Sequence, residues 1–180
     1  MLRKLALATA AVAMTGSAAM AADLYIPETP APIVESAGFG FEGLYAGVQL
    51  GGYFADAMDN QLVLGGVVGY NFTADPLLFG IELQGNYYFE TDTYPEPAAE
   101  LLALGKIGFV ATENFAIYAT GGVGYVWEEN LDYSVYALGV GAEFKVTDDM
   151  SIRGDVLGLA YNDADEFDGA RATVGVLWHF

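Results

Sequence analysis

The chain has 180 residues, and its 24 Asp and Glu outnumber its six Lys and Arg to give a formal net charge of −18. This composition lacks the basic surface that nucleic-acid binding requires, and 54% hydrophobic residues are too many for a disordered acidic protein. The chain contains no cysteine, which leaves no thiol for a lipid anchor, a disulfide framework or a thiolate metal site. The length fits a single folded domain.

The first 21 residues are typical of a cleaved signal peptide. Residues 1–4 form a short basic segment, and residues 5–13 are apolar except for Thr9. Residues 19–21 offer small side chains at both cleavage-specifying positions. The apolar run is too short to span a bilayer as a helix. The sequence therefore predicts a signal peptide over residues 1–21.

Residues 22–41 contain Pro27, Pro30 and Pro32 between small and acidic residues, which favours an extended periplasmic linker. After the signal, no stretch of 18 or more apolar residues follows, which excludes a helical membrane protein. From residue 42 to residue 180, segments of about a dozen residues alternate with turn signals, as they do in small membrane barrels. We therefore expect residues 42–180 to enter a membrane as strands.

The pattern predicts an even number of strands, as single-chain barrels of this kind require. In chain order, the eight predicted strands span residues 43–54, 62–72, 77–90, 100–111, 115–127, 133–146, 151–162 and 169–180. Short turns are expected at 73–76, 112–114 and 147–150, and longer acidic loops at 55–61, 91–99, 128–132 and 163–168. Both termini and the short turns then share one side, predicted to be periplasmic, and the acidic loops lie outside.

Each strand is predicted to have one apolar face and one face that carries the polar residues. In the third strand, Ile81 and Leu83 alternate with Glu82 and neighbouring polar residues. The basic residues left after signal cleavage all fall on the polar faces: Lys106, Lys145, Arg153 and Arg171. A Lys or Arg facing lipid at mid-membrane costs about 2–4 kcal/mol, so the polar faces should line the lumen, the interior of the barrel. The second and fourth strands are apolar on both faces, and their register is less secure.

A lumen surrounded by eight strands is just wide enough for side chains to fill it. The charged residues predicted to share it are Glu82, Lys106, Glu143, Arg153, Asp155 and Arg171. Buried charges must pair, or each costs several kcal/mol. Two interpretations stay open: a salt-bridged plug that closes the lumen, and a gated ion path whose selectivity these groups set.

No catalytic, cofactor or metal site is predicted. The one histidine, His179, falls in the last strand, and nothing in the sequence fixes Ser134 or Ser151 against it as nucleophilic catalysis requires. Residues 163–168 are acidic but lack the core of a calcium loop. They are interpreted as solvated charge, with weak divalent-ion bridging to lipopolysaccharide as the alternative.

The last strand has an apolar face that ends in aromatic residues. Val176, Trp178 and Phe180 share that face, and Gly175 lies on the other. Aromatic side chains anchor at membrane interfaces, where a strand facing lipid would place them. The ending of Gly175, Val176, Trp178 and Phe180 resembles the C-terminal assembly signal of bacterial outer-membrane β-barrels.

Residues 42–52, with the sequence EGLYAGVQLGG, resemble the first strand of small outer-membrane β-barrel proteins of the alphaproteobacterial type. The Ala-Asp-Leu start at 22–24, the Gly-Tyr-Asn-Phe run at 69–72 and the closing strand are also similar. The resemblance covers residues 22–180 and implies an all-β fold: an eight-stranded antiparallel up-and-down transmembrane barrel, as in the OmpA membrane domain and porin-like proteins. Glu42 stands where the family usually has Trp or another large residue, and the short outer loops argue against adhesin or invasin roles.

We therefore expect a monomeric, non-enzymatic barrel of a Gram-negative outer membrane, with both termini periplasmic and a structural role in the envelope. The alternatives are a narrow porin-like channel for ions or small solutes and, less favoured, a lipid-modifying enzyme. Expected partners are outer-membrane lipid and lipopolysaccharide, together with the barrel assembly machinery and periplasmic chaperones during biogenesis.

Overall fold

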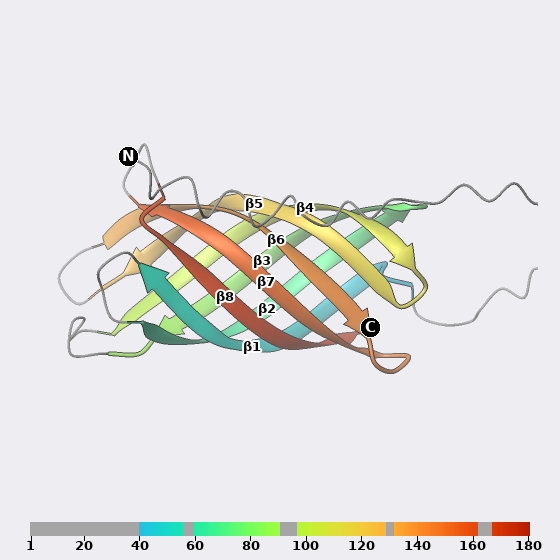
Figure 1. Cartoon of the computed structure of the whole chain (residues 1–180), viewed down its shortest axis with the longest axis horizontal. Helices are drawn as coiled ribbons and strands as arrows, with labels where there is room; N and C mark the ends of the chain where they lie inside the picture. Colours follow the sequence, from blue (N-terminus) through green and yellow to red (C-terminus); the bar gives the residue numbers. More distant parts are fainter. Residues whose placement is uncertain (1–39, 56–59, 91–96, 129–131, 162–166) are drawn as a thin grey trace, which may run out of the picture. The chain divides into compact units, whose positions relative to one another are not determined.

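A computed structural model describes residues 40–55, 60–90, 97–128, 132–161 and 167–180. Eight antiparallel strands form a closed barrel in which each strand pairs with the next and the last pairs with the first (Figure 1). In order, the strands are β1 (Gly43–Ala55), β2 (Gln61–Ala74), β3 (Leu77–Tyr88), β4 (Ala98–Thr112), β5 (Phe115–Trp127), β6 (Asp132–Lys145), β7 (Met150–Tyr161) and β8 (Gly169–His179). Within the described residues, no helix is long and apolar enough to span a membrane.

The predicted fold class is confirmed, and each strand begins and ends within two residues of its predicted bounds. The predicted signal peptide and all but the last two residues of the predicted linker lie outside the described residues, as does most of the acidic 163–168 segment. The short turns and the C-terminal residue lie at one end of the barrel, here called the terminal end (Figure 1). The opposite end, at which β1, β3, β5 and β7 end, is here called the loop end.

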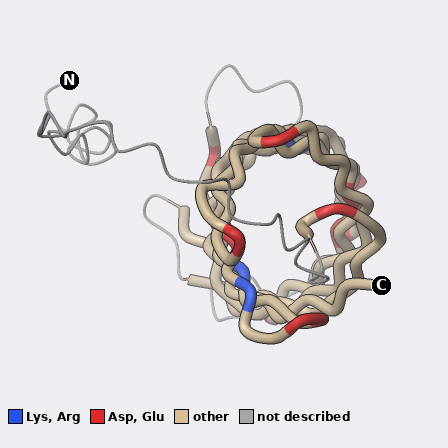
Figure 2. Tube along the Cα trace, turned by 90° about the vertical axis from the view of Figure 1, so that its right-hand side faces the viewer, with Lys and Arg blue, Asp and Glu red and all other residues tan. Residues whose placement is uncertain are grey.

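The closed ring of strands is visible along the barrel axis in Figure 2, which marks the acidic and basic positions. Period-two alternation decides which side chains enter the ring. In β3, Glu82 and Gln84 are buried, whereas Leu83 between them is 49% exposed. The register of β4, which the sequence left insecure, is settled by the pairing of its Leu104 with Glu82 of β3.

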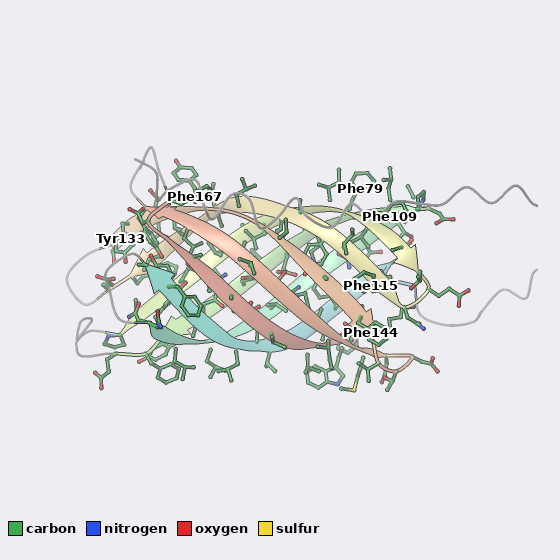
Figure 3. The ribbon with its side chains drawn as sticks, in the orientation of Figure 1. Phe79, Phe109, Phe115, Tyr133, Phe144 and Phe167 are labelled. Carbon is green, nitrogen blue, oxygen red and sulfur yellow. The ribbon has the colours of Figure 1, made fainter. Side chains whose placement is uncertain are left out.

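Large apolar side chains cover the outside of the barrel in every strand. Outward aromatic residues collect toward the two ends, with Phe79, Phe109, Phe115 and Phe144 at the terminal end and Phe167 at the loop end (Figure 3). The charged side chains of the strands are concentrated inside. A soluble barrel has the reverse arrangement, so this outer surface is suited to lipid with an aromatic girdle at each interface.

Candidate functional site: the filled lumen

A buried ion cluster, here called the central layer, is built around the carboxylate of Glu82 in β3. Arg153 Nη1 from β7 lies 2.5 Å from Glu82 Oε2, and Lys106 Nζ from β4 lies 3.3 Å from the same oxygen. The Tyr45 hydroxyl from β1 donates to that oxygen at 2.5 Å. Arg153 Nε also lies 2.7 Å from Asp155 Oδ2, so two carboxylates face one guanidinium. Four strands are joined across the lumen in this way.

Two tyrosines complete the central layer. Tyr118 donates its hydroxyl hydrogen to Asp155 Oδ1 at 2.6 Å. Lys106 Nζ lies 4.9 Å from the ring centre of Tyr45 and 4.4 Å from that of Tyr118, at cation–π distances. The rings occupy the space beside two lumen glycines: a Cβ at Gly69 would collide with Tyr45, and one at Gly141 with Tyr118. These glycines are sites of close packing.

A second cluster, the loop-side layer, surrounds Arg171 of β8. Its guanidinium is ion-paired with Glu100 of β4 and donates to the Tyr88 hydroxyl at 3.0 Å. Asn86 donates its amide hydrogen to Glu100 Oε1 at 2.8 Å. Gln84 connects the two layers, since its Oε1 accepts from Arg171 Nη2 at 2.7 Å and its Nε2 donates to Glu82 Oε1 at 2.7 Å.

Glu100 was missing from the predicted set of lumen charges, although the sequence held a signal for it. Glu100 lies six residues before Lys106 in the same strand, and an even spacing places both side chains on one face. The apolar residues on both faces of this strand obscured that face. The partner of Arg171 was therefore left unassigned.

Glu143 lies apart from both layers, in a terminal cluster with Ser151 and His179. The Ser151 hydroxyl donates to Glu143 Oε1 at 2.7 Å. Nε2 of His179 lies 3.0 Å from Ser151 Oγ and 2.9 Å from Glu143 Oε1. The expectation that no serine is fixed against His179 was wrong, because the pairing of β7 with β8 brings Ser151 and His179 together inside the barrel.

This arrangement differs from that of a nucleophilic triad. A triad places the serine on one imidazole nitrogen and the acid on the other, whereas Ser151 and Glu143 both contact Nε2 of His179. The Ser151 side chain is fully buried and its hydrogen is directed to Glu143. The geometry ties β6, β7 and β8 together and presents no nucleophile to a substrate.

Buried apolar side chains form further clusters in the lumen, which share Tyr88 with the loop-side layer and Tyr118 with the central layer. The cluster at the loop end consists of Tyr53, Val63, Tyr88, Ala98, Leu102, Leu104, Val126, Val135, Ala137, Leu157 and Leu159. The cluster at the terminal end consists of Phe41, Leu78, Ala116 and Tyr118. Asn71, also buried, has an amide with no hydrogen-bond partner within the described part of the chain.

The remaining predicted positions lie as follows. Val176, Trp178 and Phe180 point outward on β8 and just beyond it, Gly175 points inward, and Phe180 donates its backbone N–H to the Leu44 carbonyl at 2.9 Å. Across the described ranges, no group of three or more His, Asp and Glu side chains is placed to hold a metal ion.

Comparison with known proteins gives one match to a family model. The model of the outer membrane protein beta-barrel domain matches residues 8–180 of the chain. Among curated proteins, no sequence matches the chain.

Solved structures that resemble the barrel include three outer-membrane proteins. Neisserial surface protein A superposes with a TM-score of 0.53 at 9% identity, covering 76% of this chain and 96% of its own. The attachment invasion locus protein Ail of Yersinia pestis gives 0.52 at 16% identity, covering 77% and 99%. The N-terminal β-barrel domain of Pseudomonas aeruginosa OprF gives 0.51 at 15% identity, also covering 77% and 99%. At these identities, the likeness concerns the fold.

Proposed function

Since the chain belongs to the outer membrane protein β-barrel family, we propose that it is a closed, non-enzymatic barrel with a structural role in the outer membrane of a Gram-negative bacterium. The observation that supports this role is the bonding around Glu82. Arg153 and Lys106 are both ion-paired to it, and all three side chains are nearly inaccessible to solvent. The lumen at this level is filled by bonded side chains.

Opening such a lumen requires ion pairs to break without water to replace them. Removing one partner from a buried pair typically costs about 3–5 kcal/mol, because the other charge is left uncompensated. The loop-side layer around Arg171 and the apolar clusters add further barriers along the same axis. A barrel closed at several levels is suited to stabilising the membrane in which it sits.

We further propose that the terminal end faces the periplasm. The three short turns and the start of β1 share this end, and outer-membrane barrels have short periplasmic turns with longer loops outside. A single cysteine at the exposed turn residue Asp148 tests the orientation, since the chain has none of its own. A membrane-impermeant maleimide should leave this cysteine unlabelled on intact cells and label it after the outer membrane is opened. Labelling on intact cells would reverse the orientation.

The competing function is a narrow channel for ions or small solutes. It is favoured by the chain of polar side chains through Arg171, Gln84, Glu82 and Asp155, which would line a path if their bonds rearranged. Conductance of the refolded protein in planar bilayers separates the two functions. The absence of current, or rare openings of small conductance, would support the closed barrel. Stable openings of large conductance would establish the channel.

The proposed partners follow from the surface. The apolar outside fits lipid, and Lys106, Arg153 and Arg171 are buried in the lumen, so we expect contact with lipopolysaccharide to depend on divalent cations. During biogenesis we expect handling by periplasmic chaperones and the barrel assembly machinery, and the mature barrel is expected to be monomeric. Chemical cross-linking in intact membranes tests the monomer, since a regular ladder of oligomers would contradict it.

A further inference from the structure

Phe41, which lies two residues before the start of β1, is buried at the terminal end of the barrel. Phe41 precedes β1, is 2% exposed, and packs in one cluster with Leu78 of β3 and with Ala116 and Tyr118 of β5. In this eight-stranded ring, β5 is the fourth strand from β1 in either direction and is therefore the opposite wall. Phe41, predicted as the last residue of a linker, is part of the interior of the barrel.

The backbone at Gly43 turns the chain into this position. Gly43 has a φ of +114°, a conformation that residues with a Cβ rarely adopt. On either side of this turn the chain is held to the barrel. Thr73 Oγ1 donates to Glu42 Oε2 at 2.5 Å, and the Phe180 N–H donates to the Leu44 carbonyl at 2.9 Å. Phe41 is therefore joined to β1 through Glu42 and Gly43, and the backbone conformation at Gly43 favours glycine.

Phe41 also packs in the same cluster as one residue of the central layer, Tyr118. It packs with Tyr118, whose hydroxyl is bonded to Asp155 and whose ring lies 4.4 Å from Lys106 Nζ. Lys145 Nζ lies 5.1 Å from the centre of the Phe41 ring. The aromatic ring thus lies at the terminal end of the barrel, next to a tyrosine of the central layer.

We propose that Phe41 is a tethered stopper, seated in the terminal mouth through the turn at Gly43, and that its release exposes Ala116 and the Tyr118 side of the central layer to water. This device goes beyond a structural role, because it links water access at the terminal mouth to the position of Phe41. The proposal does not depend on which membrane face the terminal end occupies.

The absence of cysteine from the chain allows a clean accessibility test. Ala116→Cys places a thiol on a fully buried position against the stopper, and Asn114→Cys places one on the exposed turn two residues earlier. Both full-length variants are refolded into detergent micelles, checked by heat-modifiable gel mobility, and treated with a charged, water-soluble maleimide. With Phe41 present, Ala116→Cys should react much more slowly than Asn114→Cys.

Removing the stopper should open this position. Phe41→Ala combined with Ala116→Cys should react about tenfold faster than Ala116→Cys alone, since local opening then no longer requires the ring to leave. Gly43→Ala in the same background should also accelerate labelling, because it strains the turn while keeping Phe41. Two controls should change nothing: Phe115→Ala, an outward aromatic at the same end, and Phe41→Ala tested against Ala137→Cys in the loop-end cluster.

Two results would overturn the stopper. The first is that Ala116→Cys reacts as fast as Asn114→Cys while Phe41 is intact. This comparison does not require any Phe41 variant to fold. The other is an unchanged rate for Ala116→Cys when Phe41→Ala is added to a barrel that has folded normally.

Discussion

Replacing Glu82 with glutamine tests the central layer directly. The substitution keeps the size of the side chain but removes the charge that Lys106 and Arg153 face at 3.3 and 2.5 Å. Arg153 keeps Asp155 at 2.7 Å, whereas the ion pair of Lys106 is lost. The cost should therefore approach that of one broken buried pair, about 3–5 kcal/mol.

Urea unfolding of the barrel refolded into micelles measures this cost, with tryptophan fluorescence and gel mobility as independent probes of the same transition. A loss of about 3–5 kcal/mol lowers the urea midpoint by about 1–5 M at urea slopes of about 1–3 kcal/mol per M. Glu90→Gln, an exposed change of the same chemistry just beyond β3, is the matched control and should stay within about 0.5 kcal/mol of the wild type.

A second substitution separates lost pairing from a general packing defect. Lys106→Met removes the uncompensated cation while keeping a long apolar side chain, so adding it to Glu82→Gln should restore much of the lost stability. A cost below about 1 kcal/mol for Glu82→Gln would refute the reasoning, since the pairs would then not hold the lumen closed. A double variant whose loss of stability equals the sum of the losses in the two single variants would also contradict the reasoning.

Three further predictions use the same unfolding assay or cell fractions. Leu83→Arg should destabilise the barrel by about 2–4 kcal/mol in lipid vesicles, because it places a cation on the outer face at mid-strand, and a neutral result would contradict the lipid-facing assignment. Asn71→Leu should stabilise by about 1–3 kcal/mol, since its buried amide has no partner in the described residues; destabilisation would show that the amide is satisfied. Deleting Phe180, which is 79% exposed, should slow insertion in cells yet leave refolding in detergent unchanged, as gel mobility can compare; equal folding in both settings would exclude an assembly signal.

The sequence by itself determined the strands and their faces. A strand repeats every two residues, so the alternation of Ile81, Glu82 and Leu83 is readable without neighbours. Turn residues bounded each segment, and the even strand count implied a closed barrel. The assignment of cations to the lumen required only the cost of exposing them to lipid.

Tertiary structure decided which inward side chains meet. Glu100 and Arg171 lie 71 residues apart in the chain, and their pairing depends on the register of every strand between them. Ser151 and His179 come together only because β8 pairs with β7 and closes the ring onto β1. The position of Phe41 depends on the backbone conformation of Gly43, the first residue of β1. Period-two alternation states which face a residue occupies, but closure and register set its height and its neighbours, and these are properties of the whole ring.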